Sequence, residues 1–319
     1  MQEWEYRHTQ LTSSHNADQI EKNALFNNVS TFEYAVLDET LTDELPDLMS
    51  ESVGVQNFHR ADLVKEELVG GAIEIVKKRL TDLGQLYPFI ISGGSLEIDP
   101  GKSKSSWVYK FCLFASLADD LVPTRDLRAC FELLALETLV AFAGSGARGM
   151  RTGHPWDLYS HKFLSAKEVF AKLRDECNDA HDWSWQPIEE LPDDPTYRSL
   201  KDLGLDVVVW KGMPDSRGGN KYFLGQCATG RADLERKSSE LSLTRLQEWM
   251  RLPDAAATRT FITPFYILNE SHIRSLCRTG GLVFDRSRIV KLVAQSDSLS
   301  QINVDHCQKL IAVVENAVG

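Results

Sequence analysis

Two short apolar runs joined by a turn-rich segment constrain this chain more than any other feature. Residues 205–210 read LDVVVW, residues 221–227 read KYFLGQC, and the segment between them contains GMPDSRGGN. Runs of this length that are rich in β-branched and aromatic residues, and that are separated by Gly, Pro, Asp and Asn, are typical of paired antiparallel strands. We therefore predict a β-hairpin over residues 205–227.

The sequence around the hairpin predicts an α/β domain over residues 124–319. Helices are indicated where apolar residues recur at spacings of three and four, and strands where short apolar runs lie between turn residues. The order of helix, strands, helix, strand and helix describes a mixed α/β domain. The predicted helices cover 125–144, 165–177, 232–250 and 304–318, and the further predicted strands cover 259–267 and 280–285.

Residues 1–123 are predicted to form an N-terminal extension of helices and a small strand pair. The first sixty residues are polar, with an acidic tract over 41–51 that contains Pro46, so we expect irregular structure with short helices there. Residues 61–86 have the spacing of an amphipathic helix. The runs 87–99 and 107–117 flank a turn-rich loop and predict two strands, although a helix remains open for the second run.

Composition limits the classes of protein that this chain can belong to. Its 319 residues suffice for about two modules. No apolar run approaches the roughly 18 to 20 residues that cross a bilayer, and the start MQEWEYRHTQ does not resemble a secretory signal, so a cytoplasmic protein without a membrane partner is expected. The six cysteines form no CxxC pair, which indicates reduced thiols. The formal charge of −11 argues against a protein that coats nucleic acid, but it does not exclude a nuclease.

Two motifs are better explained as ordinary structure. The GSGARG segment over 144–149 has the letters of a dinucleotide-binding loop, but it closes a predicted helix instead of opening one. Cys177 and His181, with His154 and His161 upstream, lack the second cysteine of the usual structural zinc spacings, so a solvated face is the better interpretation. The sequence also contains no G-x-S-x-G elbow and no Walker loop, which disfavours serine hydrolases and nucleoside triphosphatases.

Asp206 and Gln226 are two polar residues that the predicted hairpin carries within its apolar runs. A polar side chain in a buried strand destabilises the fold unless it finds partners, and on adjacent strands these two side chains can converge. A carboxylate and an amide oxygen are hard ligands that suit Mg²⁺. The alternative is structural, with Asp206 capping a turn and Gln226 bonding backbone at a sheet edge.

In this order of elements the chain resembles the PD-(D/E)XK, or restriction-endonuclease-like, nuclease superfamily in its QxK variety. Members have a first helix bearing Glu, a strand with GxD, a hairpin strand with (D/E/Q)xK, a second helix, and then a further strand and helix. Here GLDVVVW supplies Asp206, GQCATG supplies Gln226, and the first helix offers Glu132 and Glu137. Because the superfamily's Glu typically precedes a Leu-Val pair, Glu137 is favoured. The HPWD, GLDVVVW and GQCATG segments are also similar to uncharacterised bacterial proteins associated with phage defence.

The chain departs from the superfamily at the motif lysine, because Ala228 stands two residues after Gln226. We predict that Lys237 supplies the missing cation, with Arg231 as the second choice. Lys237 would lie in the second turn of the predicted helix, and the alternative is a solvated partner of Glu240 or Asp233. Arg286 and Arg288 are candidates for phosphate contacts, although solvated surface arginines are the more common case.

The resemblance implies a restriction-endonuclease-like mixed sheet flanked by helices and a metal-dependent DNA endonuclease, with RNA left open as a target. One or two Mg²⁺ or Mn²⁺ ions would be held by Asp206, Gln226 and Glu137, the last through water. The expected setting is the effector of a prokaryotic antiphage system, with a helicase, an ATPase or another defence protein as partner and homo-oligomerisation as an option. The rival is a catalytically degenerate subunit that keeps the fold as a structural or nucleic-acid-sensing component of a larger complex.

Overall fold

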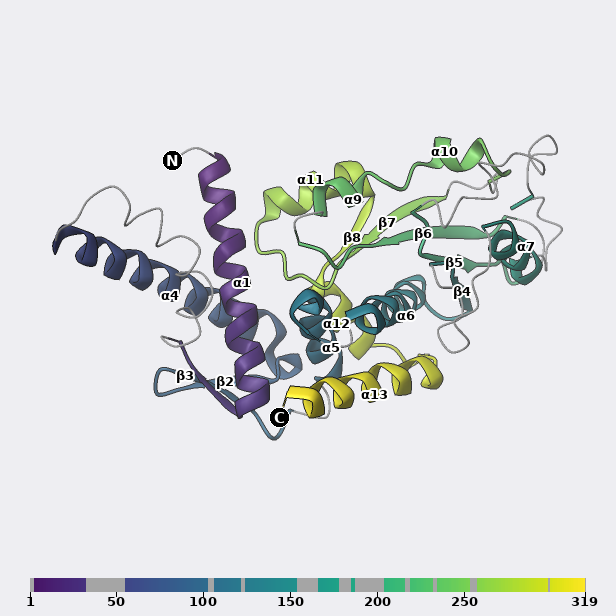
Figure 1. The fold of residues 1–319 in the computed structure, drawn as a ribbon. Coiled ribbons are helices and arrows are strands. Elements are labelled where there is room, and N and C mark those ends of the chain that lie inside the picture. The colour runs from purple at the N-terminus through teal and green to yellow at the C-terminus, as the bar shows by residue number, and fades with distance from the viewer. Residues whose placement is uncertain are drawn as a thin grey trace. The chain divides into compact units, whose positions relative to one another are not determined.

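The computed structural model shows a mixed α/β protein that divides into two compact units (Figure 1). Unit 1 comprises residues 1–117 and 311–319, and unit 2 comprises residues 118–310. The structure describes residues 3–32, 55–102, 106–121, 124–153, 166–177, 185–186, 204–215, 219–231, 234–252, 257–297 and 299–318. Within these ranges no helix is long and apolar enough to cross a membrane.

Unit 1 combines long helices with a small antiparallel sheet. Its elements are α1 (Glu3–Asn27), β1 (Val29–Thr31), α4 (Val55–Leu83), a 3-10 turn η1 (Gly84–Leu86), β2 (Phe89–Ser92), β3 (Ser95–Ile98) and α5 (Trp107–Ser116). The strand order is β1-β3-β2. Gly93 and Gly94 join β2 to β3 with φ of +54° and +84°, and a two-residue hairpin loop of this hand requires positive φ at both positions.

Two expectations for unit 1 are wrong. Residues 3–27 form one helix instead of irregular structure, and this helix buries Asp18 and Glu21 completely because charged partners meet them inside the unit. Residues 107–116 form α5, so the strand expected first is wrong and the helix that remained open is confirmed; seven of its ten residues are buried. A helix that is buried on nearly all sides reads as a continuous apolar run, so its pattern does not differ from that of a buried strand. The acidic tract 41–51 lies outside the described residues.

Unit 2 is built on a five-stranded mixed sheet with the order β4-β5-β6-β7-β8. The strands are β4 (Ala147–Arg151), β5 (Val207–Lys211), β6 (Lys221–Cys227), β7 (Thr258–Ile262) and β8 (Leu282–Phe284). The β4–β5 and β5–β6 pairs are antiparallel, whereas the β6–β7 and β7–β8 pairs are parallel. The predicted hairpin is therefore confirmed, and it provides the central strands β5 and β6.

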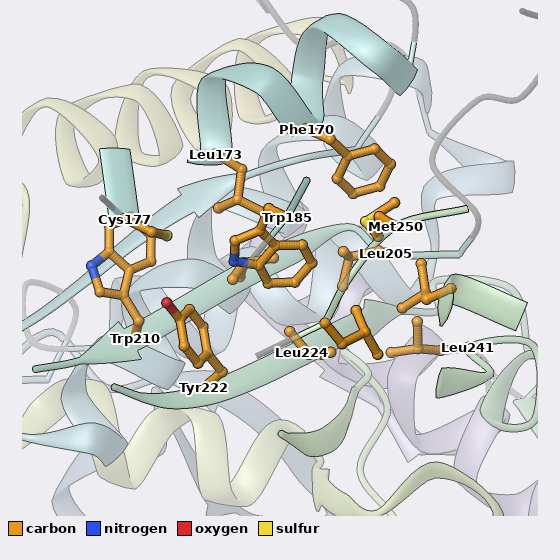
Figure 2. Close-up of a cluster of buried hydrophobic side chains, with 13 residues drawn as sticks. Phe170, Leu173, Cys177, Trp185, Leu205, Trp210, Tyr222, Leu224, Leu241 and Met250 are labelled. Carbon is orange, nitrogen blue, oxygen red and sulfur yellow. The ribbon is translucent and has the colours of Figure 1, made fainter. Parts of the chain in front are cut away.

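Helices cover both faces of this sheet. The helical elements from residue 118 onward are η2 (Ala118–Asp120), α6 (Thr124–Ala143), α7 (Ala166–Cys177), α9 (Leu234–Ser238), α10 (Leu243–Gln247), α11 (Glu270–Gly280), α12 (Arg286–Ala294) and α13 (Gln301–Val318). Residues 311–318 of α13 belong to unit 1. α6 packs against β4, β5 and β6. On the other face, Val208 and Leu224 meet a cluster that includes Trp185, which stacks on Phe170 of α7 (Figure 2).

The helices predicted at 125–144, 165–177 and 304–318 are confirmed, and four other elements differ from prediction. The 232–250 helix is two short helices, because the chain leaves α9 at Ser238 and Ser242 caps a new helix, accepting the Arg245 N–H at 3.3 Å. The GSGARG segment does follow the end of a helix at Ala143, but it then leads into β4, which was not predicted. Helices α11 and α12 were not predicted either.

Candidate functional site

Asp206 lies directly before β5, at the end of the sheet where β4 stops and β6 ends. The β5–β6 register pairs Val207 with Gly225, and continued by one residue it sets Asp206 opposite Gln226. The Asp206 N–H donates to the Gly225 carbonyl at 2.9 Å. The carboxylate Oδ2 accepts the Cys227 N–H at 2.6 Å, so it lies at the peptide that joins Gln226 to Cys227. Antiparallel pairing therefore brings the two predicted residues to one end of the hairpin.

The Gln226 side chain is buried and its amide has a partner at each end. Its Nε2 donates to Glu240 Oε2 at 3.0 Å, and its Oε1 accepts the Leu241 N–H at 3.0 Å. The same Glu240 oxygen lies 2.9 Å from Lys237 Nζ, and both of these side chains are about one-third exposed, at 35%. Lys237 is thus the ion-pair partner of Glu240 that the alternative interpretation named. Lys237 and Gln226 nevertheless contact the same Glu240 oxygen.

Glu137, the α6 carboxylate that the resemblance favours as a metal ligand, accepts hydrogen bonds from residues at the start of α13. Its Oε2 accepts the Ser300 N–H at 2.9 Å, and its Oε1 accepts Asn303 Nδ2 at 2.6 Å. A carboxylate at a helix N-terminus satisfies backbone donors that have no partner within the helix. The contacts give Glu137 a capping role within unit 2.

Glu132 is the carboxylate of α6 that reaches the Asp206 end of the sheet. Its Oε2 lies 2.6 Å from Arg151 Nε at the end of β4, and both side chains are largely buried. The next two residues, Thr152 and Gly153, donate their N–H groups to the Asp206 carbonyl at 2.7 and 3.0 Å. Three segments therefore meet here: α6, the end of β4 and the start of β5.

Apolar side chains surround Ala228, the residue at the position where the superfamily carries its motif lysine. Ala228 is 3% exposed, its N–H donates to the Ile262 carbonyl at 3.0 Å, and it packs in a cluster with Leu234 and Phe261. Arg231, the second candidate for the missing cation, holds its guanidinium 4.8 Å from the ring centroid of Phe265, which is a cation–π geometry.

The expectation of a phosphate contact is wrong for Arg286. Its side chain is fully buried, and its Nε donates to the Pro264 carbonyl at 2.8 Å. The alternative of a solvated surface arginine is wrong for Arg286 as well, because Asp285 caps α12 by accepting the Arg288 N–H at 3.1 Å and Arg286 begins that helix in the interior. Arg288 is partly buried and donates to the Val283 carbonyl at 2.6 Å. Both arginines therefore tie α12 to β7 and β8.

Two carboxylates and one guanidinium act on the Cys227 thiol at this end of the sheet. Burial, followed by the negative charges of Asp206 and Glu132, raises the pKa of the Cys227 thiol well above its ordinary value, and the charge of Arg151 opposes this rise. A thiol with this pKa stays protonated at neutral pH and is a poor nucleophile. Cys227 therefore serves as a neutral neighbour of the charged groups.

Asp206 and Glu132 are the carboxylates at this end of the sheet whose oxygens are of the kind that Mg²⁺ binds. Mg²⁺ is commonly bound by one or two carboxylates together with waters, and these side chains supply two hard oxygen donors at one end of the sheet. All four candidate ligands already have polar partners: Asp206 accepts the Cys227 N–H and Glu132 pairs with Arg151, whereas the Gln226 amide and the Glu137 carboxylate are bonded through both of their polar atoms. In the part of the chain that the structure describes, no group of three or more His, Cys, Asp and Glu side chains is arranged to hold a metal ion. His154, His161 and His181 lie outside that part.

Of the three charged residues at this end of the sheet, Asp206, Glu132 and Arg151, the sequence analysis ranks Glu132 second and does not name Arg151. Glu132 was set aside for Glu137 on a Leu-Val pattern, although Glu132, Leu136 and Leu139 share the i, i+4, i+7 stripe that an amphipathic helix turns toward its core. Arg151 was missed because β4 was not predicted.

Comparison of the chain with protein-family models, with curated proteins and with solved structures gave no match.

Proposed function

We propose that unit 2 is a metal-dependent DNA endonuclease with its active site at the Asp206 end of the sheet. The observation that carries the proposal is the pairing of β5 with β6, which sets Asp206 against the Gln226–Cys227 peptide, where Glu132 and Arg151 also converge. The order of α6, β5, β6, α9, β7 and α11 supports it, because it is the order of elements in the PD-(D/E)XK superfamily that the sequence resembles.

Asp206 and Glu132 are the residues that would hold Mg²⁺ or Mn²⁺. A divalent ion bound there supplies polarisation of the scissile phosphate and a more acidic bound water. The Cys227 N–H fixes the Asp206 carboxylate, so its orientation is set before any ligand arrives. Glu240 and the Leu241 N–H fix the Gln226 amide in the same way.

A cation near the phosphate stabilises negative charge that develops during hydrolysis. Lys237 remains our proposed source of this charge, because Glu240 connects it to Gln226 and its side chain is partly exposed. Arg231 is the second choice because its guanidinium stacks on Phe265.

The acidic composition supports a partner subunit. A chain with a formal charge of −11 gains little from the phosphate attraction on which most DNA-binding proteins depend. A helicase, an ATPase or another protein of a cytoplasmic antiphage system would supply the basic surface, and the nuclease would act as its effector.

Plasmid cleavage tests this proposal. The wild-type protein should nick or linearise plasmid DNA in Mg²⁺ or Mn²⁺ and not in EDTA, and Asp206→Asn should abolish cleavage, because that substitution removes one ligand charge but keeps the shape of the side chain. Asp175→Asn is the matched control, since this side chain is 70% exposed at the end of α7. Cleavage by Asp206→Asn at the wild-type rate would move the active site elsewhere.

The second candidate is a non-catalytic subunit, and the packing of Ala228 favours it. The motif position that carries Lys in the superfamily is enclosed here by apolar side chains, which exclude a charge. If this candidate is correct, the protein cleaves no DNA with any divalent metal, alone or with its partner, but it still binds DNA or the partner in a pull-down with purified components.

A further inference from the structure

Glu132 faces the sheet because of its place on α6. A side chain added at Gly149 would lie 2.5 Å from Leu136, and one added at Gly225 would lie 3.2 Å from Leu139, so both leucines contact the sheet. Glu132 lies four and seven residues before them, and residues at these spacings share one face of a helix. Glu137 is five residues after Glu132, which is about 140° further around the axis at about 100° per residue.

Arg151 holds Glu132 from the opposite element. It follows Gly149 by two residues in β4, so the two residues point to the same face of the strand. The Arg151 and Glu132 side chains are 5% and 15% exposed, and a charge-assisted pair with so little solvent contact is screened weakly.

Gly153 provides the space that the Glu132 carboxylate occupies. A Cβ built at Gly153 would lie 2.0 Å from Glu132 Oε2 and 2.6 Å from Glu132 Cδ, far inside contact distance. The φ of Gly153 is outside the left-handed region, so a side chain here is excluded by Glu132 and not by the backbone conformation. The Gly153 N–H also donates to the Asp206 carbonyl, which joins this space to the start of β5.

We propose that Arg151 and Gly153 are positioning residues that together set the Glu132 carboxylate beside Asp206, so that the two carboxylates act as one ligand pair. This inference rests on the proposed function. Gly153 leaves room for the carboxylate and Arg151 fixes its direction.

Gly153→Ala is the most specific test, because the atom it meets is the end of a flexible side chain and not backbone. The Glu132 carboxylate must move, while the fold can remain. We expect the Mn²⁺ concentration for half-maximal single-turnover cleavage to rise at least about fivefold, and Mn²⁺ affinity measured by calorimetry to fall by a similar factor. DNA affinity in EDTA, measured by fluorescence anisotropy, should not change. Gly70→Ala is the matched control, since no atom lies within 4 Å of an added Cβ there.

Arg151→Lys provides the second test. It keeps the positive charge but loses the planar fork, so it should raise the Mn²⁺ requirement by less than Gly153→Ala does. If wild type cleaves, Asp206→Asn does not, and both positioning variants keep the wild-type Mn²⁺ dependence, the inference is overturned and the proposed function stands. A lowered melting temperature with unchanged Mn²⁺ dependence also overturns it, because it shows a structural role alone. A wild-type protein that neither cleaves DNA nor binds Mn²⁺ overturns both.

Discussion

Replacing Arg79 by Met should strongly destabilise unit 1, because this substitution removes a fully buried positive charge from between two buried carboxylates. The Arg79 Nη1 atom lies 2.8 Å from Asp18 Oδ1 and 2.8 Å from Glu21 Oε1, and all three side chains are 0% exposed. Tyr87 and Tyr109 donate their hydroxyls to Glu21 at 2.6 Å and 2.8 Å. Burial opposes the charge of Arg79, but the charges around it, Glu21 first, raise its pKa well above the ordinary value.

The expected loss follows from the charge that remains after the substitution. Met fills a volume similar to that of Arg but leaves two buried carboxylates without this guanidinium, and breaking a buried pair in this way costs about 3 to 5 kcal/mol. At about 3 °C per kcal/mol for a unit of this size, the midpoint of thermal unfolding should fall by about 10 to 15 °C.

Thermal and urea unfolding followed by circular dichroism measure this loss. The matched control is Lys77→Met on the same helix, whose ion pair with Glu74 has side chains 55% and 73% exposed; its effect should stay within about 0.5 kcal/mol. Adding Asp18→Asn and Glu21→Gln to Arg79→Met should recover much of the stability, because the buried charges are then gone. A loss below about 1 kcal/mol in Arg79→Met would refute the argument that this network is buried and charged.

Three further predictions concern unit 2. Gly225→Ala should cost about 1 to 3 kcal/mol in urea unfolding, because the added Cβ would lie 2.4 Å from Val207 Cγ2, and Val207→Ala should relieve it; additive losses in the double variant would contradict this. Gln226→Leu should cost about 1 to 3 kcal/mol, since it leaves the buried Leu241 N–H without its acceptor, and equal stability would show that water replaces the amide. Burial raises the pKa of Cys130 to about 12, whereas the pKa of a cysteine in an unfolded chain is about 8.5. Between these two values the folded state keeps the thiol proton and the unfolded state loses it. Stability should therefore fall as the pH rises from about 9 to 12, and urea unfolding of wild type and Cys130→Ala at pH 8 and 10.5 should show a smaller fall in the variant.

The hairpin and the amphipathic helices of unit 2 were predictable because local pattern and burial agree there. LDVVVW and KYFLGQC consist of strand-forming residues around a turn-rich loop, and the β5–β6 register follows from that arrangement. The position of Asp206 beside Gln226 followed from the same register. Residues 107–116 were not predictable in the same way, because a run that is apolar on nearly all sides suits a buried helix as well as a buried strand.

Residues whose partners come from elsewhere in the chain account for other differences between the sequence predictions and the structure. The polar sequence of α1 suggests irregular structure, but its buried charges are balanced by Arg79, about sixty residues away. Glu137 and Glu132 look alike in the sequence, and the structure gives them different partners, at the start of α13 and at the end of β4. Arg286 looks like a surface arginine until α12 places it against the Pro264 carbonyl.

Calorimetric titration of Mn²⁺ into the 319-residue protein tests most directly whether Asp206 and Glu132 form a metal site, because it requires no knowledge of the DNA substrate. Wild type should give a saturable binding curve, Asp206→Asn should weaken it at least about tenfold, and Asp175→Asn should leave it unchanged. Wild-type protein that shows no saturable binding at millimolar Mn²⁺, or Asp206→Asn that binds as tightly as wild type, would contradict the proposed active site.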